Sequence, residues 1–347
     1  MHWAKTQSLA RFNLASSGVA PFPLGELKAD FGEMEINTEN SYGYAPLQQA
    51  IAGHCRVDSE CVVEAAGTSM ANHLAMAAIL EPEDEVLLEQ PTYGLLVDLA
   101  KYLRVNLKRF QRREENGWAI DPDELRRAVS ARTKLIVLTN PHNPTSIFTG
   151  DETLAAINRV AESVDASVLV DEVYLETAYA TPPRSAFHLS PRFVTTNSLT
   201  KAYGLSGLRC GWILAQPDLA WKIRRLNDLF GSVPVHPGEF LSVAAFRNLP
   251  LLRKRAKDLV GRDRATLAGF VANNERLSVV ETLSGTTIFP RLRDGDVDSF
   301  AERLRNDFET TVVPGRFFEM PDHFRIGMGV DNEMFAEGLA RIGKALR

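Results

Sequence analysis

A serine, a lysine and an arginine stand close together in a glycine-rich stretch beyond the middle of the chain. Lys201 follows Ser198 by three residues, and Arg209 comes eight residues after the lysine. A lysine amine forms Schiff bases with carbonyl compounds, and an arginine can bind phosphate through two parallel hydrogen bonds. This stretch therefore places a nucleophilic amine beside groups that can hold a phosphate.

A second short segment could bind the same phosphate. Gly67, Thr68 and Ser69 stand at the start of an expected helix. Backbone N–H groups and the positive end of the helix dipole attract anions at such a position. An amine together with a phosphate cradle suggests a phosphorylated aldehyde as cofactor.

Three further polar side chains could act on an aromatic ring in that aldehyde. Asp171 ends an apolar run, and a carboxylate there can keep a pyridine nitrogen protonated, which makes the ring an electron sink. Tyr174 and Asn143 could donate hydrogen bonds to a phenolate oxygen on the other side of the ring. Together these residues indicate pyridoxal 5'-phosphate.

These residues follow short apolar runs that alternate with helical stretches between residues 61 and 215. The strand-like runs include 85–88, 134–138, 167–170, 193–195 and 211–215, and the expected helices include 71–80, 122–129 and 151–162. Near-continuous apolar strands joined by crossover helices are typical of a mainly parallel sheet with helices on both faces. Ligands bind at the carboxyl ends of such strands. The sequence therefore predicts a three-layer α/β sandwich with its site at one edge of the sheet.

The last third of the chain has a different pattern. A long helical stretch reaches to about Asn274, strand-like segments follow at 277–281, 286–289 and 310–313, and a helical tail begins at Asn332. Turn-forming residues mark the first 25 positions. We therefore expect an N-terminal arm over residues 1–25, a large cofactor-binding domain over 26–235 and a smaller α+β C-terminal domain over 236–347.

Three motifs, in this order, carry a family resemblance. The segments NPHNPT and DEVY, followed by SLTKAYGLSGLRCGW, resemble the hallmark segments of the fold-type I, class I/II aminotransferases. The spacings, 28 residues from Asn143 to Asp171 and 30 from Asp171 to Lys201, suit one strand–helix crossover each. The resemblance extends from YGYAPL to FRIGMG. It implies an aspartate-aminotransferase-like fold, pyridoxal phosphate as cofactor and a homodimer with the site at its two-fold interface.

The resemblance also implies a role for each matching residue. Lys201 would be the internal-aldimine lysine and then the base that moves the α-proton, so that the catalytic set is Lys201, Asp171 and Tyr174. Arg325 of FRIGMG would bind the substrate α-carboxylate, with Gly18 and Asn143 beside it. The expected cofactor-binding residues are Gly67, Thr68, Ser69, Tyr93 (stacked on the ring), Asn143, Asp171, Tyr174, Ser198, Lys201 and Arg209, together with Tyr42, which the partner subunit would supply to the phosphate.

The motifs indicate the cofactor but not the outcome of the reaction. The leading expectation is an aminotransferase that moves the amino group of an L-α-amino acid to a 2-oxo acid through pyridoxamine phosphate. The alternative is an elimination, replacement or cyclising enzyme on the same fold, for example one that tailors an amino acid in secondary metabolism. A regulatory module that binds the cofactor without turnover would need a DNA-binding domain, and about 25 residues before the core are too few for one.

One position departs from the family pattern. The motif usually reads N-P-T-G, whereas Ser146 replaces the glycine in this chain. The change can alter the backbone of the loop but removes no functional group. No second arginine that would mark a dicarboxylate substrate is evident.

Composition excludes several other classes of protein. The chain has 347 residues, 39 Lys and Arg against 44 Asp and Glu, and a net charge of −5, so the basic surface that nucleic acids need is missing. The longest apolar run, 74–80, is far shorter than the ~20 residues of a membrane-spanning helix. Three scattered cysteines and no export signal favour a reducing cytoplasm. His73 and His142 have no partners at metal-ligand spacing, so we expect no metal.

Overall fold

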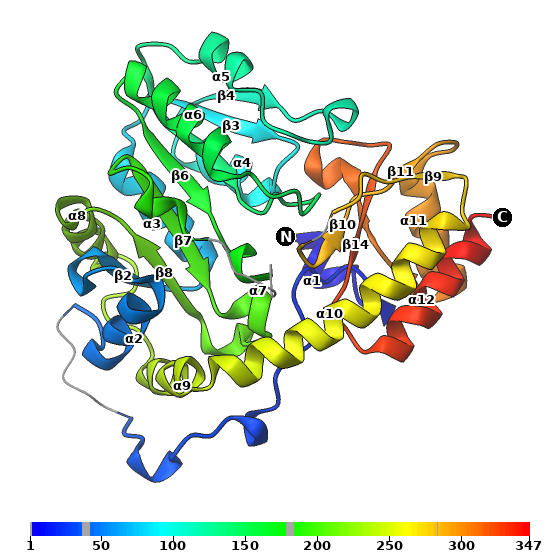
Figure 1. Cartoon of the computed structure of the whole chain (residues 1–347), viewed down its shortest axis with the longest axis horizontal. Coiled ribbons are helices and arrows are strands. Elements are labelled where there is room, and N and C mark those ends of the chain that lie inside the picture. The colour runs from blue at the N-terminus through cyan, green and yellow to red at the C-terminus, as the bar shows by residue number, and fades with distance from the viewer. Residues whose placement is uncertain (1, 37–41, 178–183, 283) are drawn as a thin grey trace.

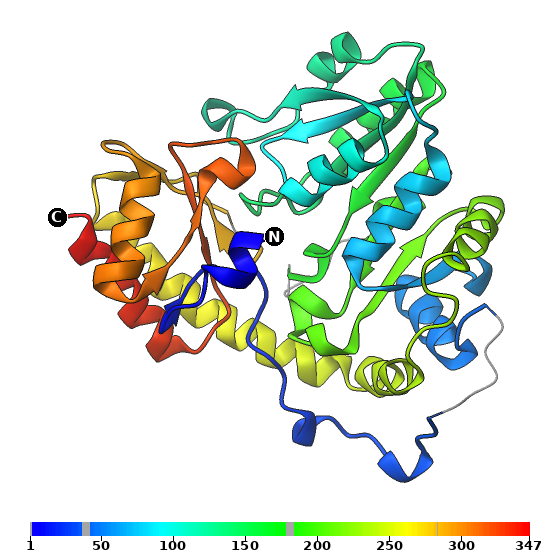
Figure 2. The ribbon, with the colours of Figure 1, turned by 180° about the vertical axis from the view of Figure 1, so that it is seen from behind.

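The computed structural model of the chain shows two bodies joined by one long helix (Figures 1 and 2). It describes residues 2–36, 42–177, 184–282 and 284–347. The larger body contains a seven-stranded sheet, and the smaller body contains the C-terminal part of the chain. The joining helix, α10 (Leu249–Ala272), is drawn in yellow and runs along both bodies.

The large sheet confirms the predicted α/β architecture. Its strands lie in the order β2-β8-β7-β6-β5-β3-β4. β8 is antiparallel to both of its neighbours, and the other neighbouring pairs are parallel. The bounds are β2 (Val62–Ala66), β3 (Glu85–Gln90), β4 (Asn106–Gln111), β5 (Thr133–Thr139), β6 (Ser167–Asp171), β7 (Phe193–Ser198) and β8 (Cys210–Leu214).

Helices cover both faces of this sheet and make the three layers. Successive strand residues point to opposite faces, so Val86 and Leu88 join one core cluster while Leu87 joins another. The first face packs against α3 (Thr68–Ile79), α4 (Gly94–Tyr102) and α8 (Pro217–Asn227). The second packs against α2 (Ala45–Cys55), α5 (Pro122–Ala128), α6 (Asp151–Ser163) and α9 (His236–Arg247). The short helix α7 (Thr200–Tyr203) follows β7.

The smaller body is built from short strands and three longer helices. The strands are paired as β10 (Thr287–Ile288), β14 (Phe324–Gly327) and β13 (Val313–Pro314) in one antiparallel sheet, and β9 (Leu277–Ser278) with β11 (Arg291–Leu292) in another. α10 packs beside α12 (Asn332–Ala345), and α12 packs beside α11 (Val297–Phe308). The carboxylates of Asp296 and Asp331 cap α11 and α12 by accepting backbone N–H bonds.

The N-terminal segment is part of the smaller body. After α1 (His2–Thr6), β1 (Phe12–Asn13) pairs in parallel with β12 (Thr310–Thr311). Leu14 is fully buried in the core of the smaller body. Short 3-10 helices complete the structure: η1 (Leu24–Glu26), η2 (Phe31–Glu33), η3 (Ser59–Cys61), η4 (Glu114–Asn116), η5 (Leu175–Thr177), η6 (Ala186–His188), η7 (Ser206–Leu208) and η8 (Gly315–Phe318). Within the described residues, no helix has the length and apolar character needed to cross a bilayer.

A buried pair of carboxyl groups joins β2 to α9. Burial raises the pKa of Glu64 well above its usual range, and the hydrogen bond between Glu64 and Glu239 raises it further. The backbone of Tyr44 and the charge of Arg224 lower the pKa, but less strongly. On the other side of the pair, the imidazole of His236 lies 3.3 Å from Glu239. The raised pKa of Glu64 therefore favours its protonated form beside Glu239.

We expect the substitution Glu64→Gln to stabilise the protein at alkaline pH. Folding raises the pKa of this carboxyl group, so the folded protein loses stability relative to the unfolded chain as the pH rises above the unfolded pKa of 4.5. The loss continues until the pH passes the folded pKa. Glutamine stays neutral and still donates a hydrogen bond to Glu239. The thermal unfolding midpoint should therefore fall less between about pH 5 and about pH 9 in E64Q than in the wild type. An equal or larger fall in the variant would show that the pair is not the source of this loss.

Candidate active site

The residues predicted to do chemistry lie at the carboxyl ends of neighbouring parallel strands. Asp171 is the last residue of β6, Asn143 follows β5, and Lys201 lies in α7, just after β7. Asp171 is in register with Thr196 of β7. Electrostatic interactions link Lys201 to Asp171, Arg209 and Arg325. The fold therefore gathers residues that are far apart in the sequence at one edge of the sheet.

Asp171 is a buried carboxylate held in one orientation. Its Oδ2 accepts a 2.8 Å hydrogen bond from Asn72, and its Oδ1 accepts one of 3.0 Å from the backbone N–H of Val173. Thr196 donates to the Oδ1 of Asn72 at 2.6 Å, which fixes the amide. Burial raises the pKa of Asp171 to about 6, although these bonds and the charge of Lys201 oppose the rise. A buried carboxylate of this kind is suited to a cationic ring nitrogen.

Lys201 carries an amine whose pKa lies close to neutral. Desolvation is the main cause that lowers its pKa to about 8, and the positive charges of Arg325 and Arg209 lower it further. The carboxylate of Asp171 acts in the opposite direction. About a tenth of the amine is therefore unprotonated at pH 7, far more than for a lysine with an ordinary pKa, and the unprotonated form is the one that attacks an aldehyde.

The predicted phosphate cradle forms at the N-terminus of α3. Gly67 precedes the helix with a positive φ of 81°, and a Cβ at this position would overlap the Arg209 guanidinium. Arg209 donates to the carbonyl of Ala66 at 2.8 Å, and Ser198 accepts from the backbone N–H of Thr200 at 3.3 Å.

One hydroxyl in this cradle supports the phosphate assignment. The Thr68 hydroxyl is buried and has no hydrogen-bond partner among the described residues. A buried donor without a partner is costly, and a phosphate oxygen would satisfy it. The residues present therefore fit the phosphate group of pyridoxal phosphate.

Two tyrosines lie beside this cradle. Tyr93 directly precedes α4 and hydrogen-bonds with Ser69. The hydroxyl of Tyr174 donates to Ser17 at 2.8 Å. Burial raises the pKa of both phenols, so both remain donors at neutral pH.

Arg325 brings the smaller body into the site. It lies on β14, donates to Asn143 at 2.9 Å and to the carbonyl of Ala15 at 3.0 Å, and stands 5.1 Å from the ring centre of Phe318. Its Nε is buried without a partner among the described residues. An arginine with an open donor is suited to a carboxylate.

Gly18 lies directly against the lysine. A Cβ placed on Gly18 would be 3.2 Å from the Cα and Cδ of Lys201. The next residue, Val19, donates its backbone N–H to the carbonyl of Lys201 at 3.0 Å. The N-terminal segment therefore covers the lysine, and little space remains between them.

Tyr42 is the predicted site residue that this chain does not bring to Lys201. Its hydroxyl accepts a 2.7 Å hydrogen bond from Arg225, and its ring packs edge-on against Trp221 at 4.9 Å. Both partners belong to α8. A role toward the cofactor of a second subunit stays a prediction.

Several residues of the site were not expected from the sequence. Asn72 orients Asp171 but stands outside the motifs; its position one helical turn after Thr68 was the available signal. Ser17 and Phe318 reach the site through contacts between distant segments. His142 bonds to Thr145 at 2.7 Å and to the carbonyl of Pro91 at 2.9 Å. In the described part of the chain, no three His, Cys, Asp or Glu residues could hold a metal ion together.

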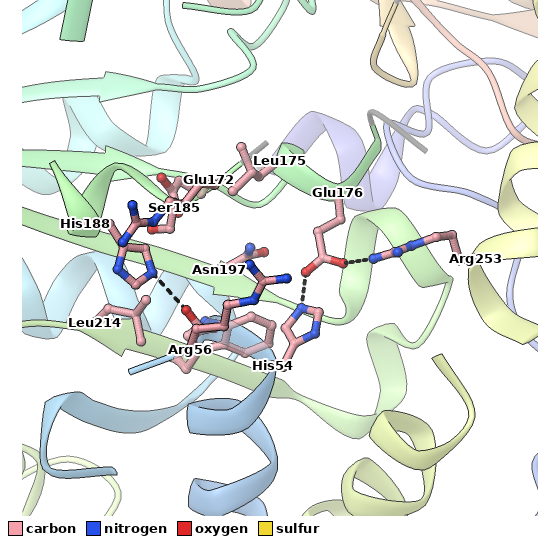
Figure 3. A pocket seen from close by; sticks show the side chains of 13 residues that line it. His54, Arg56, Glu172, Leu175, Glu176, Ser185, His188, Asn197, Leu214 and Arg253 are labelled. Carbon is pink, nitrogen blue, oxygen red and sulfur yellow. Dashed lines mark hydrogen bonds and ion pairs between the residues drawn. The ribbon is translucent and has the colours of Figure 1, made fainter. Parts of the chain in front are cut away.

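A cavity of about 340 Å³ lies on the side of the sheet covered by α2 (Figure 3). Glu176 forms part of its wall, and Figure 3 shows His54 and Arg253 directed at the Glu176 carboxylate. Tyr203 of α7 donates a hydrogen bond to the same carboxylate. Glu176 therefore links the helix that carries Lys201 to α2 and α10, and no sequence pattern predicted this role.

Comparison with known proteins agrees with this geometry. The family model "Aminotransferase class I and II" matches residues 28–342. A capreomycidine synthase of Streptomyces vinaceus is 30% identical, with 97% of this chain and 90% of that protein covered. Among solved structures, a PLP-dependent aminotransferase from Streptococcus suis has a TM-score of 0.92 at 24% identity, covering 97% of this chain and 94% of the other. The PLP-dependent cyclase OrfR has a TM-score of 0.89 at 25% identity, covering 96% and 92%.

The match of the family model over most of the chain agrees with the placement of Lys201, Asp171 and Arg325 at one edge of an aminotransferase-like sheet. The chain therefore belongs to the class I and II aminotransferases, a fold-type I family, and is a pyridoxal-phosphate-dependent enzyme.

Proposed function

We propose that this enzyme transfers the amino group of an L-α-amino acid to a 2-oxo acid. The observation that carries the proposal is the buried contact between Arg325 and Asn143 beside Lys201. The open Nε of Arg325 is suited to an α-carboxylate. Amino acids and 2-oxo acids both carry that group, so one site can receive both reactants in turn.

The chain's own side chains have distinct tasks in this proposal. Pyridoxal phosphate, when bound, draws electrons from the substrate α-carbon. Asp171 holds the protonated ring nitrogen, and Thr68, Ser198 and Arg209 hold the phosphate. Arg325 fixes the substrate carboxylate and so orients the Cα–H bond. The Nζ of Lys201 takes the proton from Cα, for which a pKa of about 8 is well matched.

A cyclising reaction is the second candidate. A capreomycidine synthase and a PLP-dependent cyclase are similar to this chain over nearly its whole length. Both candidate reactions begin when the α-proton is removed, so the same lysine, carboxylate and arginine serve either one. The two candidates differ in whether the amino group leaves the substrate skeleton.

Mixing the purified enzyme with a panel of L-amino acids should separate these reactions. Transamination converts the amino acid to its 2-oxo acid in an amount equal to the enzyme, and a second 2-oxo acid then completes the cycle. A cyclic product, or released ammonia without such exchange, would contradict transamination and support the second candidate.

We expect Lys201→Ala to lose roughly 10²- to 10⁴-fold in rate, whereas Lys344→Ala, at an exposed position of α12, should keep full activity.

The rate at which the cofactor-free protein combines with pyridoxal phosphate should rise with pH, with its midpoint at about pH 8, and then level off. The reason is that only the unprotonated Lys201 amine attacks the aldehyde, and its pKa is about 8. Asp171→Asn should shift this midpoint to lower pH, because the carboxylate raises the lysine pKa. Stopped-flow absorption can follow the reaction. A rate that is flat from about pH 6 to 9, or a midpoint near that of a free alkylamine, about 10.4, would refute the assignment.

We also propose that the enzyme is a homodimer. Large apolar side chains are exposed over residues 221–235, including Trp221 (51%), Leu229 (78%), Phe230 (49%) and Val235 (76%). A cluster of this kind marks an interaction surface. Tyr42 packs on Trp221, so the segment expected to reach the partner lies on the same surface.

Light scattering should therefore report the mass of two chains. Leu229→Asp should produce monomers because it places a charge in the apolar contact, while Leu229→Met should remain dimeric. A wild-type protein that is active as a stable monomer would contradict the proposal.

We propose a cytoplasmic location for this enzyme. Cys55, Cys61 and Cys210 are free thiols, which a reducing compartment preserves.

A further inference from the structure

Ser146 occupies a backbone conformation that normally favours glycine. Its φ is 61°, in the left-handed region, and the residue is only 3% exposed. A non-glycine residue in this region carries strain that its surroundings must compensate. Hydrogen bonds made by the Ser146 hydroxyl can compensate this backbone strain.

That hydroxyl bonds to the smaller body. Ser146 Oγ lies 2.9 Å from Thr287 Oγ1, and the backbone N–H of Thr287 donates to Ser146 Oγ at 3.3 Å. Thr287 Oγ1 donates its own hydrogen to the carbonyl of Pro144 at 2.9 Å. Because a hydroxyl has one hydrogen to donate, Ser146 must be the donor to Thr287. Three mutually consistent hydrogen bonds thus join the loop after β5 to β10.

Neighbouring groups are shaped around this contact. The hydroxyl of Thr282 donates to the carbonyl of Ser146 at 3.0 Å. Gly285 has a φ of 84°, and a Cβ there would overlap the Ser146 side chain. A larger residue at position 285 would therefore displace Ser146 from Thr287.

The same two segments carry the carboxylate-binding pair. Asn143 stands three residues before Ser146 in the loop, and Thr287 pairs with Gly327 of β14, two residues after Arg325. The contact between Ser146 and Thr287 and the 2.9 Å contact between Asn143 and Arg325 therefore close one ring of interactions between the two bodies.

We propose that Ser146 is a positioning residue that clasps the loop of residues 143–146 to β10 and so keeps Asn143 and Arg325 arranged to bind one carboxylate. This inference depends on the proposed function in one respect, namely that the bound carboxylate is the substrate's. Loss of the hydroxyl should loosen the loop and β10 together and weaken carboxylate binding, while cofactor capture by Lys201 should be unaffected.

Two substitutions break the contact between the Ser146 and Thr287 hydroxyls, one from each side. Ser146→Gly deletes the hydroxyl and relieves the strained φ, so this variant should fold at least as readily. Thr287→Val deletes the other hydroxyl at nearly constant shape, and Thr287→Ser is the matched control that keeps it. Hydrogen exchange of the holoenzyme, followed by mass spectrometry, reports on residues 142–147 and 286–289. The affinity of the holoenzyme for acetate, followed through the cofactor absorption, reports on the carboxylate site.

We expect faster exchange in both segments and roughly fivefold weaker acetate binding in S146G and T287V, with wild-type behaviour in T287S. Both variants lose the bond between the two hydroxyls, so the loss in the double variant should be smaller than the sum of the two single losses. For any amino acid that reacts, KM should rise and kcat should change little. The proposal would be overturned if S146G and T287V kept the hydrogen-exchange rates and acetate affinity of the wild type. It would also be overturned if T287S lost as much as T287V. These binding readouts hold even if the enzyme does not transaminate, so failure of the proposed function is recognised separately.

Discussion

The contact between Arg325 and Asn143 is the constraint around which the site is arranged. Arg325 is buried, and a buried guanidinium requires partners for its donors. Asn143 comes from the loop after β5, Ala15 from the N-terminal segment and Phe318 from the smaller body. These three parts of the chain must therefore converge on one point. The positive charge held there also lowers the pKa of Lys201, so substrate binding and amine reactivity depend on the same group.

Asp171 is the matching negative group on the large sheet. Asn72 and Thr196 hold its carboxylate in place through a short chain of hydrogen bonds within the buried layer between α3 and β7. Burial destabilises the charged form of Asp171, and a cation beside the carboxylate stabilises that form. The site thus offers a buried acid for a cationic ring nitrogen, a deprotonatable amine for an aldehyde and an open guanidinium for a carboxylate.

Sequence patterns predicted the parts of the fold that depend on local chemistry. β5 and β6 were expected because their residues are apolar on both faces, as burial between two helix layers requires. β4 was missed because it is an edge strand with alternating exposure, and its NLKRFQ sequence lacks a continuous apolar run. The N-terminal segment was expected as an arm, and its pairing with β12 depends on a contact between residues about 300 positions apart.

The site likewise contains residues that local patterns predict and residues that depend on contacts between distant segments. Lys201 and Asp171 were expected because their residue types and spacing have chemical meaning on their own, and Arg325 was expected from the family resemblance of its FRIGMG segment. Asn72 acts by contacting Asp171, and Glu176 acts by contacting Tyr203 on the helix that carries Lys201. Such contacts exist only in the folded chain. Ser146 was noticed only as a departure from a motif, and its hydrogen bonds to Thr287 give that departure a physical reason.

The most direct test of the site is to locate the cofactor on the chain. Reduction of the holoenzyme with borohydride fixes pyridoxal phosphate to the lysine that holds it, and peptide mass spectrometry identifies that residue. The modification should be found on the peptide that contains Lys201, and on no other lysine. A modified lysine elsewhere, or no modification at all, would contradict the assignment of this edge of the sheet as the active site.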